Sequence, residues 1–213
     1  MRVRPILMSV PMARALVDGR KHQTRRVIKP QPPESYVLLD SRPATDVAEW
    51  VCSNDEAAPV HAVRCPHGSR GDLLWVRETW ASNNGGPATR KASISYKADS
   101  DGYRGPWRPS LHMPRWASRI TLRIDDVRVV RLQTASVTDI IAAGCPYATR
   151  EAALRWFRCQ WEASYAKREY GWETNPWVWL LEFDVMLENV DAALVRNSSS
   201  VSTNSSGLAA DEQ

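Results

Sequence analysis

The sequence predicts an α+β fold in which a small, mostly antiparallel β-barrel carries two or three helices. The main evidence is the segment 118–133, where apolar and polar residues alternate. Ile120, Leu122 and Ile124 share one side of this pattern, and a period of two is typical of a strand with one buried face. Candidate strands and helices do not alternate regularly, and the sequence has no glycine-rich phosphate-binding motif. A parallel nucleotide-binding fold is therefore disfavoured.

The N-terminal part of the chain predicts short elements followed by a long insertion. Residues 3–9 form a candidate strand, and residues 11–18 form a candidate short helix that Gly19 ends. A second strand begins at Val27. The segment 31–62 contains four prolines and little periodicity, so we expect a long loop there.

The central part of the chain predicts strands that follow glycine-rich turns. A turn at 68–72 leads into a clear strand over 73–80. A short strand over 92–97 lies within a second insertion, which covers about residues 82–110.

The segment 118–133 is long enough for one bent strand, or for two strands that break near Asp125. A short helix follows, because Ser136 and Asp139 have the spacing of a capping box. This helix extends to Ala143, where a glycine ends it.

The C-terminal part predicts a helix over 149–166, with an apolar face, and a closing strand over 176–185. Residues 1–193 then make one domain. Residues 194–213 are rich in serine and contain no aromatic residue, so we expect a disordered tail.

Positive charge is concentrated at the N-terminus. The chain has a net charge of +4, but residues 1–30 contain eight Lys or Arg and a single acid, Asp18. A local basic block predicts a polyanionic partner such as RNA. The alternative is a solvated basic surface with no ligand.

The composition disfavours several other classes of protein. No stretch of 18 uncharged apolar residues occurs, and the N-terminus lacks the apolar core of a signal peptide. Four cysteines in 213 residues do not make a disulfide scaffold, so a reduced, cytoplasmic protein is expected. Cys52, His61, Cys65 and His67 lie close in sequence, but their spacing is not that of a known zinc motif. We therefore expect neither a metal nor another cofactor.

The densest group of candidate site residues lies between Gly19 and Arg26. Gly19 can turn the chain, and an extended segment would place Thr24 and Arg26 on one face with Lys21 close by. A partly buried lysine beside other cations has a lowered pKa and can act as a base or nucleophile. It could activate the Thr24 hydroxyl, while Arg26 could hold a phosphate or carbonyl oxygen. A basic loop without a ligand is the alternative.

These residues have the spacing G-x-K-x-x-T-x-R, which resembles the signature of the ASCH domain, a member of the PUA-like superfamily. Over residues 1–187 the chain also resembles the small ASCH-like proteins of tailed phages and prophages. The segments that carry this likeness are PIL at 5–7, QTRR at 23–26, GD at 71–72, WVRETW at 75–80, MPRWASR at 113–119 and NPWVW at 175–179.

The resemblance implies a PUA-like β-barrel, in the cytoplasm of a bacterial host, that binds RNA or a modified nucleoside. One bacterial branch is similar to N4-acetylcytidine amidohydrolase, which hydrolyses an acyl group with a Lys, a Thr and a Glu. Lys21 and Thr24 match two of these positions. The glutamate position falls at or near Gly144, where this sequence has no carboxylate. The ligand-binding residues that we expect around this motif are Gly19, Arg20, Arg25 and Arg26.

Glu78 is the best substitute acid. Alternation places it with Val76 and Trp80 on one face of its strand. A buried carboxylate needs a partner, and Lys21 or Arg26 is the expected one. Glu78 would then be either a catalytic acid beside Lys21 and Thr24 or half of a structural ion pair.

Further candidate residues lie outside the Gly19–Arg26 segment. Arg115 and Trp116 could clamp a base by stacking, unless Trp116 only closes one end of the barrel. Cys145 directly precedes a proline and is interpreted as structural rather than nucleophilic. The same interpretation applies to Trp156 and Trp161, which we assign to the core.

Three functions therefore stay open. The first is a binding module for RNA or a modified nucleoside. The second is a hydrolase that acts on a modified pyrimidine nucleoside or on RNA, as the resemblance implies. The third is a non-catalytic phage or prophage accessory protein. Whether the chain is an enzyme is left open by its sequence.

Overall fold

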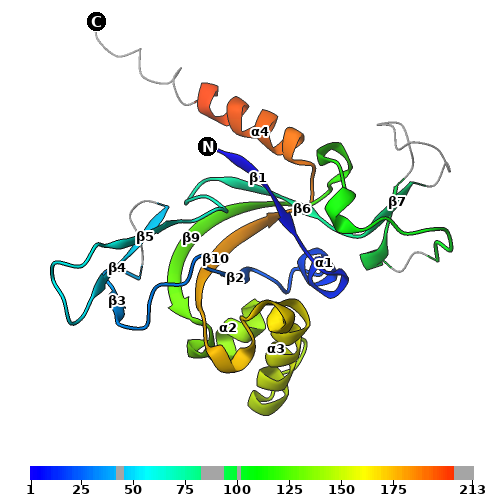
Figure 1. The fold of residues 1–213 in the computed structure, drawn as a ribbon. Helices are drawn as coiled ribbons and strands as arrows, with labels where there is room; N and C mark the ends of the chain where they lie inside the picture. Colours follow the sequence, from blue (N-terminus) through cyan, green and yellow to red (C-terminus); the bar gives the residue numbers. More distant parts are fainter. Residues whose placement is uncertain (42–45, 83–93, 100–101, 204–213) are drawn as a thin grey trace, which may run out of the picture.

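The protein is built around a five-stranded sheet with the strand order β1-β6-β9-β10-β2 (Figure 1). The computed structural model describes residues 1–41, 46–82, 94–99 and 102–203. The strands are β1 (Val3–Leu7), β2 (Gln23–Val27), β6 (Leu73–Arg77), β9 (Thr121–Arg131) and β10 (Trp177–Met186). Only β1 and β6 pair in parallel; the other neighbours are antiparallel.

The α+β class and the mostly antiparallel sheet are confirmed, but the predicted closed barrel is not formed. Within the described part of the chain, β1 and β2 are the two edges of an open sheet. The longest pair, β9 with β10, runs through its centre and is visibly curved (Figure 1).

The predicted strand 118–133 is one strand with a bulge rather than two strands. Glu182 lies opposite Asp126 and Phe183 opposite Ile124, so Asp125 is the extra residue on β9. A bulge bends a strand without interrupting it. This explains why the acidic pair at 125–126 looked like a break in the sequence.

The predicted helices are present. They are α1 (Val10–Val17), α2 (Val137–Ala142) and α3 (Arg150–Tyr165). The capping box of α2 is complete, because the Ser136 hydroxyl accepts from the Asp139 amide and the Asp139 carboxylate accepts from the Ser136 amide. In Figure 1, α2 and α3 lie together on one side of the sheet.

A fourth helix corrects the expectation of a tail that is disordered from residue 194. Helix α4 (Val190–Thr203) begins with Val190 and Ala193 buried against Leu73. The serine-rich composition concealed this helix, because the apolar contacts found in its described part come from Val190, Ala193 and Leu194, before the serines begin. The rest of the expected tail, residues 204–213, lies outside the described residues.

The expected loop over 31–62 is also wrong. It contains β3 (Tyr36–Leu38) and β4 (Val47–Cys52), and β5 (His61–Arg64) follows, so that the three form a separate antiparallel sheet. Trp50 is fully buried in the main core. The strands are short and flanked by prolines, so their periodicity was too brief to recognise.

Two smaller differences concern strand boundaries. Strand β2 begins at Gln23 rather than Val27, because its polar residues are buried on both faces. The predicted strand 73–80 ends at Arg77, and Trp80 begins β7 (Trp80–Ser82), which pairs with β8 (Ile94–Tyr96). The second insertion falls partly on residues 83–93 and 100–101, outside the described residues. Short 3-10 helices occupy Lys97–Asp99, Ser110–His112, Arg115–Ala117, Leu132–Thr134, Ala166–Arg168 and Trp172–Thr174.

The two faces of β10 contact different cores. Trp179 packs in the main core with α1 and the three-stranded sheet, whereas Val178 packs with α2 and α3 in a second cluster. Val27 of β2 belongs to this second cluster as well. The edge strand β2 is thereby packed through Val27 against α2 and α3.

Candidate functional site

The segment from Gly19 to Arg26 runs from the end of α1 into β2. Gly19 adopts a φ of 67°, which a glycine tolerates, and the amides of Arg20 and Lys21 both donate to the Ala15 carbonyl. Lys21 then forms an isolated bridge to Ala143 at the end of α2. Lys21 is therefore held between α1 and α2 before β2 starts, whereas Thr24 and Arg26 lie on the strand itself.

Lys21 is only 2 % exposed. Its Nζ donates to the Gln23 carbonyl and to the Ala143 carbonyl, each over 2.8 Å. Burial, and secondarily the charges of Arg26 and Arg25, lower the pKa of Lys21 to about 7. The burial of Lys21 and its cationic neighbours thus account for the lowered pKa that the sequence suggested.

Gly144 allows this close approach of α2 to Lys21. Its φ is 97°, and a Cβ atom there would lie 2.8 Å from the Cβ of Ala15 and 3.2 Å from the Cβ of Lys21. No side chain fits between these groups. Arg20 also contacts this position, because its Nη1 donates to the Gly144 carbonyl over 3.0 Å.

Arg25 lies on β2, and its side chain contacts α2 and α3. Its Nη1 donates to Gln23 Oε1 over 2.7 Å, its Nη2 lies 3.4 Å from Asp139 Oδ2, and its guanidinium lies 5.5 Å from the Phe157 ring centroid. Burial lowers the pKa of Arg25 to about 10, partly offset by Asp139. Arg25 therefore fixes β2 against α3 and remains a cation at neutral pH.

Arg26 is less engaged. Its Nη2 donates to the Leu7 carbonyl over 2.7 Å and lies 3.6 Å from Met8 Sδ. Its Nε is buried without a hydrogen-bond partner. Much of its donor capacity is therefore unused.

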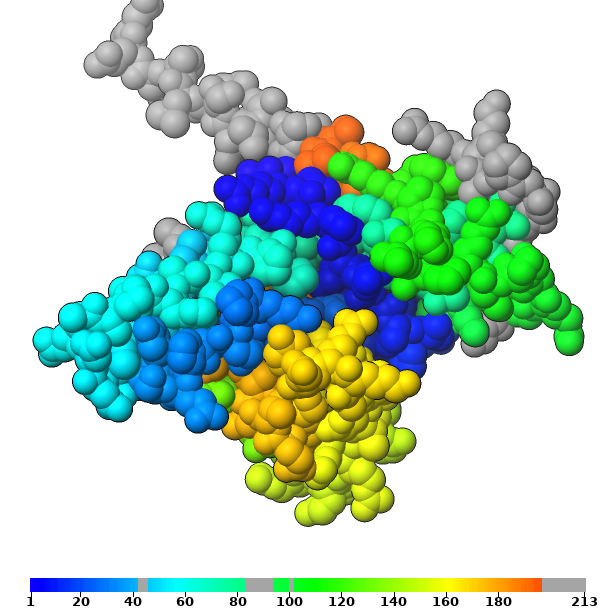
Figure 2. All heavy atoms as spheres, in the orientation of Figure 1, coloured from blue at the N-terminus to red at the C-terminus, as the bar shows by residue number. Residues whose placement is uncertain are grey.

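A cavity separates these cations from helix α3. Its volume is about 120 Å³, and Lys21, Thr24, Arg25 and Arg26 line one wall. The opposite wall comes from α3, through Trp156, Phe157, Gln160, Trp161, Ser164 and Tyr165. Figure 2 shows the yellow atoms near the end of α3 close to the dark-blue N-terminal residues. The lining residues include no carboxylate, so the cavity favours an anionic or neutral ligand.

The aromatic wall is the part of the site that sequence reasoning assigned to the core. Phe157 and Trp161 are indeed buried, but both line the cavity with the half-buried Trp156 and Tyr165. The residues 157, 161 and 165 are spaced four apart, as are 156, 160 and 164. Two adjacent stripes of this kind were the available signal for a helix face broader than core packing needs.

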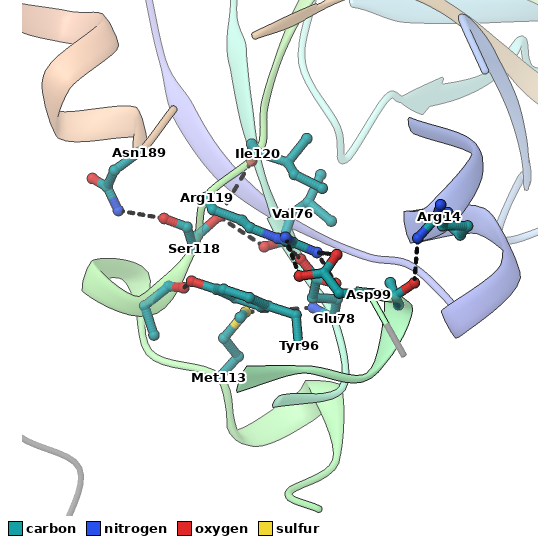
Figure 3. Close-up of polar contacts among 12 residues, drawn as sticks. Arg14, Val76, Glu78, Tyr96, Asp99, Met113, Ser118, Arg119, Ile120 and Asn189 are labelled. Carbon is teal, nitrogen blue, oxygen red and sulfur yellow. Dashed lines mark hydrogen bonds and ion pairs between the residues drawn. The ribbon is translucent and has the colours of Figure 1, made fainter. Parts of the chain in front are cut away.

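Glu78 lies elsewhere, which corrects its expected pairing with Lys21 or Arg26. It is 1 % exposed and accepts two hydrogen bonds from Arg119, to Oε1 over 3.0 Å and to Oε2 over 3.2 Å. Arg119 also binds Asp99 through two bonds and lies 3.9 Å from the centroid of the Tyr96 ring (Figure 3). Burial raises the pKa of Glu78 despite Arg119. Glu78 does not line the cavity of Lys21 and Thr24.

Arg115 and Trp116 are also away from this cavity. Arg115 Nη2 lies 2.6 Å from Asp191 Oδ1 at the start of α4. Trp116 packs edge-on against Trp80, with 6.2 Å between ring centroids. Neither residue lines the cavity, so a base clamped by this pair would occupy a different place.

The four candidate metal ligands do not form a site. Among the residues that the structure describes, no group of three or more His, Cys, Asp or Glu side chains is arranged to hold a metal. His61 packs edge-on against Trp50, and burial raises the pKa of Cys65 to about 11. Burial and the charges of Arg26 and Arg4 lower the pKa of His67 to about 4. Cys145 is buried, and its Sγ accepts from the Tyr147 amide over 3.4 Å, consistent with a structural role.

Comparisons with protein-family models, with curated proteins and with solved structures gave no match. No helix in the described part of the chain is long and apolar enough to cross a membrane.

Proposed function

We propose that this chain binds RNA or a modified nucleoside in the cavity between β2 and α3. The observation that carries the proposal is the composition of the two walls. Lys21, Arg25 and Arg26 supply positive charge on one side, Trp156, Phe157, Trp161 and Tyr165 supply rings on the other, and the lining holds no acid.

Nucleic acid components match this combination of groups. Their bases have flat faces that stack on aromatic side chains, and their phosphates are bound by arginine and lysine. The net positive charge of the N-terminal segment acts in the same direction, since it attracts polyanions over longer distances. On the sequence likeness described above, we propose that the chain is an ASCH-like, PUA-like domain of a phage or prophage that acts in the host cytoplasm.

Hydrolysis is a second candidate, favoured by Lys21. At a pKa of about 7 much of this lysine is a neutral amine, which can donate to both carbonyls and still accept a proton. The Thr24 hydroxyl lines the same cavity and makes no hydrogen bond within the described residues. Thr24 Oγ would attack the acyl carbon of an N4-acylcytidine as Lys21 takes the hydroxyl proton. The bond from the acyl carbon to N4 would then break, with the proton passing from Lys21 to the amine of the departing cytidine. Water would finally hydrolyse the Thr24 ester, which releases the acid and restores the hydroxyl. The remote position of Glu78 makes binding the better supported of the two functions.

The test is incubation of the full chain with N4-acylated cytidines, unmodified cytidine and short RNAs. Binding is measured by quenching of tryptophan fluorescence, and turnover by mass spectrometry. Arg26→Gln is the site variant, and the exposed Arg155→Gln on α3, outside the cavity lining, removes the same charge as a control. Binding of the short RNAs that Arg26→Gln weakens and Arg155→Gln does not would support the proposal. No binding of any probe would refute it.

Turnover is judged with Lys21→Met. A deacylated or cleaved product that disappears in this variant would establish a hydrolase. Intact substrates with measurable binding would leave a binding module, and failure of all probes with a folded protein would favour an accessory role without a nucleic acid ligand.

A further inference from the structure

Arg26 presents an unsatisfied hydrogen-bonding group in the cavity wall. Of its three nitrogens, Nη2 is engaged by Leu7 and Met8, and Nε is buried with no partner. The Nε of Arg25, in the same wall, is also buried without a partner. Both Nε atoms are closed to solvent, as are those of Arg77, Arg115 and Arg128 elsewhere. The donor of Arg26 that lacks an acceptor is therefore Nη1, which makes no hydrogen bond within the described residues.

The missing acceptor carries negative charge. The cavity lining contains three cationic side chains and no carboxylate. Asp139 balances Arg25 from one side, but no acid contacts Arg26 or Lys21 within the described residues. Burial is the larger cause of the lowered pKa of Lys21, and the nearby charges of Arg26 and Arg25 lower it further. A phosphate matches the planar fork of an arginine through parallel hydrogen bonds.

The opposite wall of the cavity contains an aromatic ring and a side-chain amide that could contact a base. Trp156 is half-buried, and within the described residues it makes no ring–ring contact. Gln160, one turn further along α3, is also half-buried, and no hydrogen bond of its amide is found in the described part of the chain. A tryptophan face stacks on any nucleobase, and a glutamine amide both donates and accepts at a base edge.

The size of the cavity limits the ligand to one base. Its volume of about 120 Å³ is well below the range of about 300–1,000 Å³ that drug-sized ligands occupy. An RNA segment with several bases does not fit, whereas one base with its phosphate outside or at the rim does.

From these features we infer that the cavity binds a single nucleobase that carries a phosphate monoester, as a free nucleoside monophosphate or as the phosphorylated end of an RNA strand. The inference rests on the proposed function and narrows it, because it places an anion at Arg26 and excludes a neutral nucleoside as the preferred ligand. Trp156 and Gln160 become the residues that determine which base is accepted.

The experiment compares affinities for four kinds of probe by isothermal titration calorimetry with the full chain. The probes are cytidine, its 5′- and 3′-monophosphates, inorganic phosphate, and a short RNA with either a phosphate or a hydroxyl at its ends. We expect one monophosphate to bind at least about tenfold more tightly than cytidine, as for a single charge-assisted pair. A phosphorylated RNA that outcompetes the mononucleotide would identify the strand end as the source, and the reverse result would identify the free nucleotide.

Variants assign the two halves of the ligand. Arg26→Gln should remove the preference for the monophosphate and leave cytidine binding, and Arg26→Lys should restore it only in part. Trp156→Ala should weaken cytidine and monophosphate alike, while Arg155→Gln and the exposed Tyr147→Ala should change neither. Circular dichroism of each variant checks that it is folded.

Three outcomes would overturn the inference. Equal affinity for cytidine and its monophosphates would refute the anion site and leave the proposed function intact. Inorganic phosphate that binds as tightly as the monophosphates would refute the role of the base. Absence of binding by every nucleoside, nucleotide and RNA probe would refute both the inference and the proposed function.

Discussion

Lys21 and Ala143, 122 residues apart in the chain, are joined by a hydrogen bond of 2.8 Å from the lysine Nζ to the alanine carbonyl. The same Nζ holds the Gln23 carbonyl. A neutral amine keeps two N–H donors, so both bonds persist when Lys21 loses its proton. The lysine can therefore connect α2 to β2 in either protonation state.

The first prediction concerns pH. The pKa of Lys21 falls from 10.5 to about 7 on folding, so between these values the unfolded chain binds a proton that the folded chain does not. The free energy of unfolding should then rise with pH, by at most about 1.4 kcal/mol per pH unit. Lys21→Met should remove this rise, as measured by urea unfolding between pH 7 and 9.

The upper limit of pH 9 restricts the contribution of a second titrating group, the Cys65 thiol, which is present in both proteins. The pKa of Cys65 rises from 9.0 to about 11 on folding, so above pH 9 this thiol makes stability fall as pH increases. Lys21→Met also leaves two buried carbonyls without their donor, which lowers stability by about 1–3 kcal/mol at every pH. Parallel slopes for the two proteins would show that Lys21 keeps an ordinary pKa.

The second prediction concerns the buried ion cluster. Removing Arg119 leaves the Glu78 carboxylate buried without its partner, and breaking a buried pair costs about 3–5 kcal/mol. Arg119→Met should lose stability on this scale in urea unfolding. Arg158→Met, which breaks an exposed pair with Glu173, should change it by no more than about 1 kcal/mol.

The double variant separates charge from packing. Adding Glu78→Gln to Arg119→Met removes the unpaired charge and should recover part of the loss. If the double variant is no more stable than Arg119→Met, the damage comes from lost packing against Tyr96 rather than from the buried carboxylate.

Much of the fold could be predicted because its signals are local. The alternation around Ile120–Ile124, the capping box at Ser136 and the apolar face of α3 each specify one element without reference to the rest of the chain. The strands between Tyr36 and Arg64 could not be predicted in this way. They are three to six residues long. Trp50 is buried by residues of the main core that are distant in the sequence, so its burial cannot be predicted from the local pattern.

The site was predictable on one wall only. The motif residues lie within one segment of eight residues, so their proximity could be predicted. In the structure one cavity is lined by Lys21, Thr24 and Arg26. The partner of Glu78 is Arg119, 41 residues away. The sequence contains many other arginines that could pair with Glu78, and no local pattern singles out Arg119. The contribution of α3 depends on how the helix packs against β2, which no local pattern encodes.

The third prediction concerns Gly144. An alanine there must adopt a φ of 97° and place its Cβ 2.8 Å from Ala15. Gly71→Ala is the matched control, because φ is 85° but nothing lies within 4 Å of the new Cβ. Both should lose about 1–2 kcal/mol from backbone strain, and Gly144→Ala should lose more. Gly144→Ala would also shift the β-bridge between Lys21 and the adjacent Ala143. Because Lys21 lines the cavity, the affinity for the ligand should fall together with the stability. Equal losses in the two variants would mean that the clash is relieved by a small movement of α1.

The fourth prediction concerns helix α4, where the sequence suggested a tail. Ala193 is fully buried against Leu73 and Val190, whereas its neighbour Ala192 is exposed. Ala193→Asp would bury a carboxylate in this contact without a partner, and burial of an unpaired charge is strongly unfavourable. Ala192→Asp adds the same charge to the same turn in contact with water. We expect Ala193→Asp to lower the midpoint of thermal unfolding by several degrees and Ala192→Asp to leave it nearly unchanged. Identical midpoints for the two variants would show that α4 is detached from the sheet in solution and that Leu73 contacts water. The tail expected from the serine-rich sequence would then be correct.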